Sequence, residues 1–195
     1  DLGTTLTGWG TSWADFDNDT DLDLFLVHGH VPVTDLATDG EPLQLVVNET
    51  AQGRPGVFSL PTDGAGIDAL GSLNGRGSAA ADYDNDGDLD VVLVTLGGPL
   101  MLLENRGGPG NFVTVDLGGM RPGAVVTAAL PDGTMLAREV HAGSSWLSSE
   151  DPRIHFGLGS AASAVITVTW PDGSVTDLGS VDANHFVGVD PGDDK

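Results

Sequence analysis

The sequence lacks cysteine altogether, which excludes disulfide bonds, thiolate zinc sites and cysteine nucleophiles. Basic residues are scarce: seven lysines and arginines stand against 29 aspartates and glutamates, so the formal net charge is -22. Because such a charge repels phosphate groups, nucleic acid and anionic membranes are not expected as partners. No apolar run approaches the ~20 residues that a bilayer span requires, so we expect no span.

Glycine and proline, in contrast, are plentiful. The chain has 29 glycines and 11 prolines among 195 residues, and its hydrophobic content is 39%. This composition favours short strands joined by many turns, and the length allows one large or two small domains with real cores. We therefore expect an all-β protein.

Two nine-residue segments, 15–23 and 82–90, carry aspartate at every second position. Like charges at this spacing repel one another and raise each other's pKa unless a hard cation binds them. A loop of this kind can offer side-chain oxygens from its first, third, fifth and ninth residues and a main-chain carbonyl from its seventh. Glycine at the sixth residue would make the sharp turn, which fits Gly87 better than Thr20. Calcium is the natural candidate for both loops.

A solvated acidic loop is the alternative interpretation of any aspartate run. Here the same spacing occurs twice, and each run is followed by an apolar, strand-like segment, at 24–27 and 91–94. Such segments would attach the loops to a sheet, which favours metal binding over a free acidic tail. An EF-hand would need helical periodicity on both sides of the loop, and neither side has it.

The two runs belong to longer, self-similar units. Each unit starts with a Gly-x-Gly stretch and continues through the aspartate run into apolar segments that supply about four strands. A four-stranded unit in tandem is typical of β-propeller blades, of which a closed ring has ~4–8, so two blades would form part of a larger propeller. The later segments of the two units are 43–49 with 57–60, and 100–105 with 111–113.

This pattern resembles the FG-GAP or VCBS repeat, best known from the propellers of integrin α-subunits. In that family the aspartate loop binds calcium between the first two strands of a blade. The resemblance implies two Ca2+ sites with main-chain carbonyl donors at Asp21 and Asp88. It implies side-chain ligands at Asp15, Asp17, Asp19, Asp23, Asp82, Asp84, Asp86 and Asp90.

From about residue 110 the aspartate runs stop and alternating segments follow. Two of the connections between these segments, at 131–133 and 171–173, contain the same Pro-Asp-Gly turn, in which proline presets one φ and glycine accepts a positive one. The pattern predicts a small antiparallel β-sandwich or barrel, so we assign 1–110 to the blades and 111–195 to this domain. The expected strands are 112–117, 124–130, 135–141, 153–156, 165–170, 175–178 and 185–189.

The second domain also resembles a known family. Arg-Ile-His-Phe-Gly-Leu-Gly at 153–159, preceded by Arg-Glu-Val-x-Ala-Gly-Ser-Ser at 138–145 and followed by Trp-Pro-Asp-Gly at 170–173, is similar to the ASPIC/UnbV domain. That domain typically follows FG-GAP repeats, as in the cartilage acidic protein family and many secreted bacterial proteins. The order is the same here, and the two resemblances together cover nearly the whole chain.

Other candidate sites are fewer. His28 and His30 are one residue apart, so both could lie on one side of a strand and bind a transition metal. We interpret His155 as a structural histidine rather than a catalyst. Trp13 is expected in the core, whereas two or more exposed tryptophans would make a platform for sugars. Asn48 meets the acceptor rule for N-glycosylation.

The sequence thus predicts a secreted or cell-surface calcium-binding module that acts in adhesion or surface assembly, with no catalytic residue. The expected partners are a protein or glycan at a surface, and further blades or another chain. One alternative is an enzyme or accessory protein of bacterial natural-product biosynthesis, because UnbV-type sequences also resemble family members whose genes are found near such pathways. Carbohydrate binding is another. A pocket with convergent histidines and carboxylates would favour the enzyme, and exposed tryptophans the sugar binder.

Overall fold

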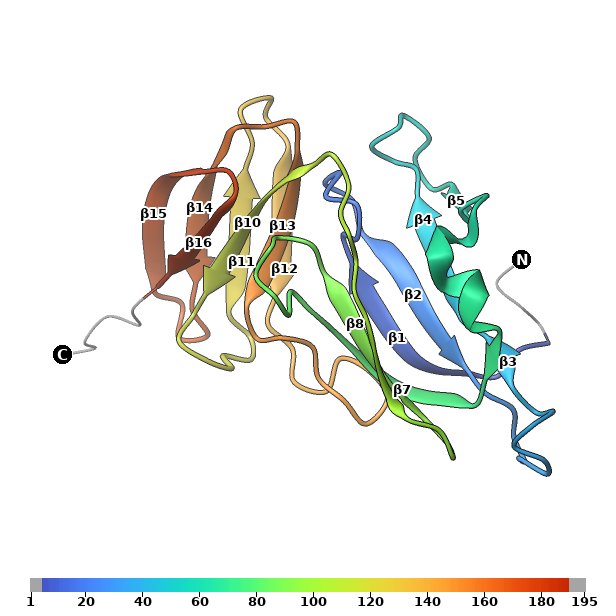
Figure 1. The fold of residues 1–195 in the computed structure, drawn as a ribbon. Coiled ribbons are helices and arrows are strands. Elements are labelled where there is room, and N and C mark those ends of the chain that lie inside the picture. The colour runs from blue at the N-terminus through green and yellow to red at the C-terminus, as the bar shows by residue number, and fades with distance from the viewer. Residues whose placement is uncertain (1–4, 190–195) are drawn as a thin grey trace.

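The computed structural model describes residues 5–189 as strands and one short 3-10 helix (Figure 1). The protein is all-β, as the sequence predicts. The strands of residues 8–103 form one group of sheets, and those of residues 111–188 form a second group beside it (Figure 1). Within the described residues no helix is long and apolar enough to cross a membrane.

The first sheet is an antiparallel meander of β1 (Gly8–Ala14), β2 (Asp23–His28), β4 (Gln44–Asn48) and β5 (Phe58–Ser59), in that order. The first aspartate run connects β1 to β2, and Ala14 pairs with Asp23 where the run begins and ends. The loop is therefore held at the end of a hairpin rather than in a free segment.

The second sheet repeats this arrangement with β7 (Gly75–Ala81), β8 (Asp90–Thr95) and β9 (Leu100–Leu103). Ala81 pairs with Asp90 around the second aspartate run, and both β1 and β7 carry a bulge just after their first glycine. The two first strands also lie close together, because a Cβ at Gly10 would be 2.5 Å from Ser78 Oγ. The repeat predicted from the sequence is thus present in the strand pairing.

The second sheet has three strands among the described residues, not the four that the sequence predicted. Residues 111–113, assigned to a fourth strand, belong to β10 (Asn111–Asp116) in the other group of sheets. The reason is that four consecutive residues of β10, from Phe112 to Val115, are all buried. A strand buried on both faces needs the centre of a covered sheet, and an edge of the second sheet would expose one face.

The second group of sheets is sandwich-like and does not close into a barrel. One sheet contains β13 (Ile154–Gly159), β10 and β16 (His185–Gly188), with β16 parallel to β10. The other contains β12 (Met135–Glu139), β11 (Val125–Ala129), β14 (Ser163–Thr169) and β15 (Val175–Asp182). Fully buried side chains from both sheets, such as Val113, Phe156 and Ile166, form one core between them. All seven strands expected in this half are present.

The two Pro-Asp-Gly turns form as predicted. Gly133 and Gly173 have φ values of 93° and 88°. The N–H of Leu130 donates to Thr134 O at 2.8 Å, and that of Trp170 donates to Ser174 O at 2.9 Å. Each turn therefore closes a hairpin of the four-stranded sheet.

Two segments outside the expected strands, one within the first repeat and one between the repeats, contain structure that the sequence did not indicate. β3 (Glu41–Pro42) pairs with β6 (Ser72–Leu73), and the helix η1 (Gly64–Leu70) begins after Asp63, whose carboxylate accepts from Ala65 N–H. Side chains of η1 pack against the core of the first two sheets. The segment that contains η1 thus covers apolar surface.

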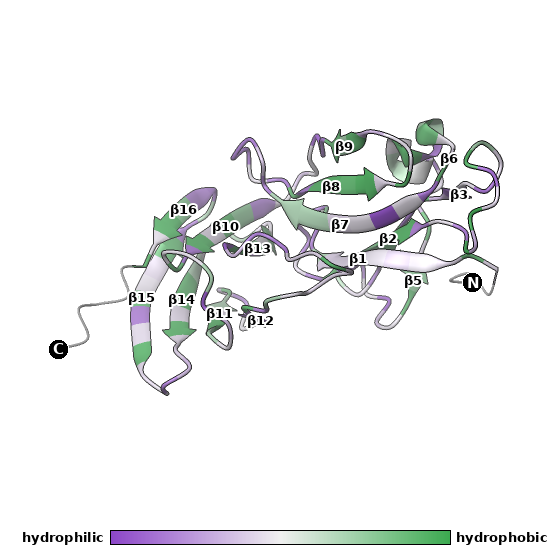
Figure 2. Ribbon diagram, turned by 90° about the horizontal axis from the view of Figure 1, so that it is seen from below, coloured by the Kyte–Doolittle hydropathy of each residue, from purple (hydrophilic) through white to green (hydrophobic). Residues whose placement is uncertain are grey.

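Trp13 is 56% exposed, so its assignment to the core was wrong. Its neighbours Ser12 and Ala14 are the buried residues of this part of β1. Alternation along a strand allows one set of side chains to face inward, and the close approach of β1 to β7 admits only small ones. Figure 2 shows β1 as a pale strand next to β7, with the strongly hydrophobic β8 on the far side of β7.

Candidate metal sites

The two aspartate runs fold into loops of the same shape, called here loop 1 (residues 15–23) and loop 2 (residues 82–90). Their fourth residues have positive φ, 59° for Asn18 and 61° for Asn85, and so do their sixth residues, 94° for Thr20 and 97° for Gly87. Thr20 thus adopts nearly the same φ as Gly87. A side chain at such a φ costs roughly 1 kcal/mol, so loop 1 carries strain that loop 2 avoids.

The first carboxylate of each loop organises the turn. Asp15 accepts hydrogen bonds from the N–H groups of Asp19 and Thr20, at 3.0 and 2.9 Å. Asp82 accepts from the two equivalent N–H groups of loop 2, at 3.1 and 3.0 Å. Both aspartates are 2% exposed. The repeated motif therefore encodes a repeated hydrogen-bond pattern.

The ninth carboxylate fastens each loop to its sheet. Asp23 accepts from Phe16 N–H at 3.1 Å and from Asn48 N–H, at the end of β4, at 2.9 Å. Asp90 accepts from the equivalent N–H groups of loop 2 and of Asn105, at 2.9 and 2.8 Å. Both oxygens of the ninth carboxylate are thus occupied by backbone donors.

The first, third and fifth carboxylates converge in each loop. One oxygen from each lies within 4.8 Å of the other two, which gives the clusters Asp15–Asp17–Asp19 and Asp82–Asp84–Asp86. Three convergent carboxylate oxygens are a donor set suited to a hard cation such as Ca2+. Six of the ten predicted ligands are therefore brought together, whereas Asp23 and Asp90 are not members of these two clusters.

Electrostatics also favours a cation in loop 1. Burial raises the pKa of Asp15 to about 8 and that of Asp23 to about 7. Burial, with repulsion from Asp19 and Asp21, raises the pKa of Asp17 to about 6. One buried oxygen each of Asp17 and Asp21 has no hydrogen-bond donor in the described part of the chain. Carboxylates that are withdrawn from water without donors fit a metal ion.

Loop 2 is more open to solvent. Asp84 and Asp86 are exposed, whereas their loop 1 counterparts are half-buried. Burial, followed by repulsion from the neighbouring aspartates, raises the pKa of Asp88 to about 6. The Asp88 carboxylate also accepts from Asn18 Nδ2 at 3.0 Å, so the two loops are joined directly.

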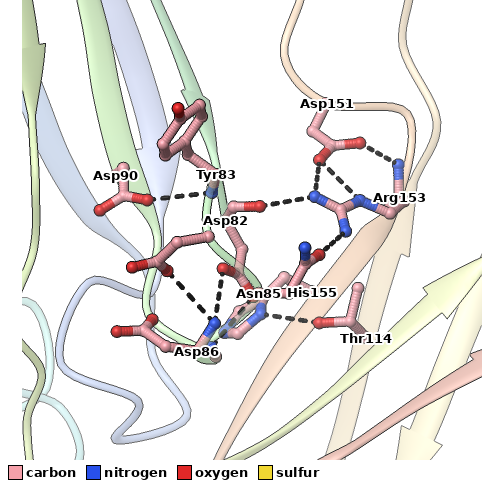
Figure 3. A network of polar contacts seen from close by, with 11 residues as sticks. Asp82, Tyr83, Asn85, Asp86, Asp90, Thr114, Asp151, Arg153 and His155 are labelled. Atoms are coloured by element: carbon pink, nitrogen blue, oxygen red, sulfur yellow. Dashed lines mark hydrogen bonds and ion pairs between the residues drawn. The ribbon is translucent and has the colours of Figure 1, made fainter.

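Strand β13 lies against both loops, with alternate residues of the 153–159 segment facing them. Arg153, just before the strand, donates through Nη1 to Asn85 Oδ1 at 2.6 Å and through Nη2 to Asp82 O at 2.7 Å (Figure 3). Its Nε donates to Asp151 at 2.8 Å, which fixes the guanidinium. The residues between, at 154, 156 and 158, are buried in the sandwich core.

His155 bridges the sandwich and loop 1. Its Nε2 lies 2.8 Å from Asn18 Oδ1. Its Nδ1 lies 3.2 Å from Thr114 Oγ1, a contact that Figure 3 shows. The ring stacks on Phe112, with centroids 5.8 Å apart. Burial lowers the pKa of His155 to about 4, so the imidazole is neutral at physiological pH. Each ring nitrogen has a protein partner, as expected of a structural histidine.

Gly157 allows β13 to approach this closely. A Cβ there would lie 2.1 Å from Asp15 Oδ2 and 2.6 Å from Asn18 Cα. Two residues further, Gly159 N–H donates to Asn18 O at 2.8 Å. The order Arg-x-His-x-Gly-x-Gly is thus explained by one strand face that packs on two loops.

Sequence reasoning missed the role of the two asparagines and of Arg153. The available signal was asparagine at the fourth position of both runs, together with the alternation of the 153–159 segment. The pairing of these features needs the relative placement of segments more than 60 residues apart, which no local pattern contains.

The histidine pair does not gather a third ligand. His28 is buried with Nδ1 2.9 Å from Pro42 O, while His30 lies 3.6 Å from a Glu41 oxygen. Across residues 5–189, the clusters of three or more ligating side chains are those of loops 1 and 2. The geometry therefore gives the transition-metal hypothesis no support.

Comparison with known proteins agrees with the second resemblance. Residues 120–195 match the family model described as ASPIC and UnbV. The chain is 30% identical over 173 residues to cartilage acidic protein 1 of Xenopus tropicalis, which covers 83% of this chain and 25% of that protein. It is 29% identical over 170 residues to the Homo sapiens and Mus musculus proteins of that name, covering 83% of this chain.

The chain spans about a quarter of the length of these curated relatives. The match lies over the part of the chain in which β11 to β16 form most of the sandwich. The expected ASPIC/UnbV domain is therefore confirmed, in a chain that is similar over most of its length to cartilage acidic protein 1.

Proposed function

We propose that the protein is a secreted or cell-surface calcium-binding module that acts in adhesion or surface assembly. The observation that carries the proposal is the pair of convergent carboxylate clusters in two loops of one shape. All donors are oxygens, which suits a hard cation, and calcium is plentiful outside the cytoplasm. The similarity to proteins named cartilage acidic protein 1 supports an extracellular setting.

Bound calcium would neutralise the crowded carboxylates and fix the loop backbones. The chain's own residues then connect the loops to the rest of the fold. Asp23 and Asp90 tie them to the sheets, and Arg153 and His155 tie them to the sandwich. The metal would thus stabilise the contacts that connect the loops to the sheets and to the sandwich. This is a structural role rather than a catalytic one.

We further propose that the first two sheets are adjacent FG-GAP/VCBS blades of a larger propeller, with the domain boundary near residue 110. The shared strand pairing and bulges support this. Apolar side chains on β8 and β9 are open to solvent: Val94 is 51% exposed, Leu100 70% and Leu102 48%. Such a surface invites a neighbouring blade, from a longer chain or from a second one. Light scattering that finds a stable, monodisperse 19.9 kDa monomer would argue against the missing blades.

Calorimetric titration of the chelator-treated chain with calcium tests the main proposal. We expect two equivalents to bind, more tightly than magnesium, which demands stricter octahedral geometry. The double variant Asp19→Ala/Asp86→Ala should bind neither. A matched control is Asp132→Asn/Asp172→Asn, which removes two exposed aspartates from the hairpin turns and should bind like the unaltered chain. If the unaltered chain takes up no calcium, the proposal fails.

One cavity favours carbohydrate binding as a second candidate function. It measures about 590 Å³, within the usual range for small ligands, and lies between β1 and β12. Exposed Trp13 lines it together with Arg138 and Glu150. An indole face can stack on a sugar ring, and the charged groups can bond to hydroxyls.

Titration with a panel of methyl glycosides, followed by tryptophan fluorescence, tests this candidate. Trp13→Ala should abolish the response, while Tyr83→Ala, which removes a 69% exposed aromatic outside the cavity, should keep it. A panel in which no glycoside gives a saturable change removes carbohydrate binding from consideration.

A further inference from the structure

Asn18 occupies a central place between the two candidate metal sites. It is the fourth residue of loop 1, and it is only 1% exposed. Its Nδ2 donates to Gly87 O at 3.1 Å and to Asp88 Oδ1 at 3.0 Å, both in loop 2. Asp88 is the residue expected to offer the carbonyl donor of loop 2. A side chain from one candidate site thus positions the backbone of the other.

The opposite end of the Asn18 amide faces the sandwich. Because Nδ2 already donates to two acceptors, the amide oxygen is the atom that meets His155, at 2.8 Å. The proton of His155 must then lie on Nε2, and Nδ1 accepts from the Thr114 hydroxyl. Stacking on Phe112 at an interplanar angle of 14° holds the ring in this orientation. These contacts form a continuous path from Asp88 in loop 2 through Asn18 and His155 to Thr114 in β10.

The equivalent residue of loop 2 is connected differently. Asn85 has the same positive φ, but its side chain is exposed and accepts from Arg153 Nη1. Among the described residues no hydrogen bond joins the Asn85 side chain to loop 1. The two asparagines thus form a natural pair for comparison, one linking both loops and the sandwich, the other linking a single loop to the sandwich.

We propose that Asn18 couples the two calcium sites to each other and, through His155, to the C-terminal sandwich. This inference rests on the proposed calcium function. Ordering loop 1 fixes Asn18, which places Gly87 and Asp88 for the second ion and the Asn18 oxygen for His155. The coupling is reciprocal, so docking of β13 also favours calcium in both loops. Calcium therefore binds cooperatively and protects β13 from local opening.

The first test compares Asn18→Gly with Asn85→Gly. Glycine accepts a positive φ, so both variants keep the loop backbone and all ten aspartates. Asp86→Ala leaves loop 1 intact and Asp19→Ala leaves loop 2 intact, so these two variants give the intrinsic calcium affinity of each loop. In a calorimetric calcium titration of the full chain, the second ion should bind about tenfold more tightly than these intrinsic affinities predict. Asn18→Gly should abolish this factor, and Asn85→Gly should retain it.

A second test concerns the link to the sandwich. His155→Leu removes the donor, whereas His155→Gln keeps an N–H near the position of Nε2. Amide exchange in β13 should slow when calcium is added to the unaltered chain and to His155→Gln. It should respond less in His155→Leu, with calcium affinity lowered several-fold in the same variant. Far-UV circular dichroism of each variant shows whether it is folded before the comparison is made.

The outcomes distinguish failure of calcium binding from failure of the coupling. If calcium binds to neither loop, the proposed function fails together with the coupling. If it binds at two sites whose affinities are independent, and Asn18→Gly and Asn85→Gly behave alike, the coupling alone is overturned. Equal exchange rates of β13 in His155→Leu and His155→Gln, with and without calcium, would likewise overturn the link to the sandwich.

Discussion

Loop 1 and loop 2 share a motif, a backbone shape and a hydrogen-bond pattern, yet their surroundings differ. Loop 1 is covered by other segments: a Cβ at Gly157 or at Gly110 would lie 2.1 Å from a loop 1 oxygen. In loop 2, Asp84, Asn85 and Asp86 remain exposed. The motif therefore sets which donors are present, whereas burial sets how strongly protons compete with a cation for them.

At the sixth position, loop 2 is the more restricted of the two loops. A Cβ at Gly87 would lie 1.9 Å from the Phe112 ring, so loop 2 needs glycine for the contact as well as for its φ. Loop 1 accommodates threonine at φ 94°. The less buried loop thus has the stricter sixth residue, because β10 packs on it at this point.

The largest expected effect comes from disturbing the packing of β13 on loop 1. Gly157→Ala should lower the free energy of unfolding by about 2–3 kcal/mol, because the new methyl would overlap Asp15 and the backbone of Asn18. Urea denaturation measures the change. Gly188→Ala is the matched control, since no atom lies within 4 Å of the position that its methyl would take and its effect should be small. Equal losses in the two variants would contradict the packing of β13 on loop 1.

Variants of loop 2 test which of its residues bind the metal through their side chains. Asp86→Ala removes a member of the carboxylate cluster and should weaken calcium at loop 2 by about 100-fold. Asp88→Asn keeps the main-chain carbonyl and an oxygen for Asn18, so its loss should be much smaller. Calorimetry distinguishes the two, and similar losses would mean that the seventh side chain is itself a ligand.

The pH dependence of stability should differ between the loops. In the calcium-free fold, Asp15, Asp23 and Asp17 have pKa values raised to about 8, 7 and 6 from 3.8. Because these folded-state values lie above the unfolded one, the folded state binds more protons between about pH 4 and 8, and stability falls as pH rises through this window.

The chelated chain should therefore melt at a temperature several degrees higher at about pH 6 than at about pH 8. Saturating calcium should reduce or reverse the difference, since protons compete with the metal. Asp17→Asn should weaken the pH dependence more than Asp84→Asn, whose side chain is exposed. Thermal melts at both pH values check this, and identical slopes for the two variants would contradict it.

The smallest effect concerns the sixth residue of loop 1. Thr20→Gly should stabilise the chain by roughly 1 kcal/mol and tighten loop 1 for calcium, because glycine adopts φ 94° freely. Denaturation with and without calcium provides the measurement. Thr38→Gly, at a position without positive φ, should give no gain, and a gain there as large as at Thr20 would show that φ is not the cause.

Much of this architecture could be predicted locally. The alternating aspartates place their loops between paired strands, and the Pro-Asp-Gly turns place the hairpins, because these features depend on neighbours within a few residues. The positive φ of Thr20 follows in the same way from comparison with Gly87. Local backbone chemistry is thus well encoded by spacing.

Features that depend on distant packing could not be predicted. Trp13 faces outward because β7 lies too close to β1 for a large inward side chain, and β10 leaves the second sheet because both of its faces are buried. The bond between Asn18 and His155 joins residues 137 positions apart. Such contacts depend on how whole sheets meet, which alternation and turn residues do not determine.

The parallel pairing of β16 with β10 has a mechanical consequence. β10 follows directly from the first two sheets, and β16 is the last strand of the described chain. Tension between the two ends of the sandwich would act along both strands in opposite directions. It would load their backbone hydrogen bonds in shear, so that the bonds from Asn184 to Phe112 and from Val189 to Asp116 must break together rather than one after another. The sandwich should therefore resist stretching more strongly than its few terminal hydrogen bonds would suggest.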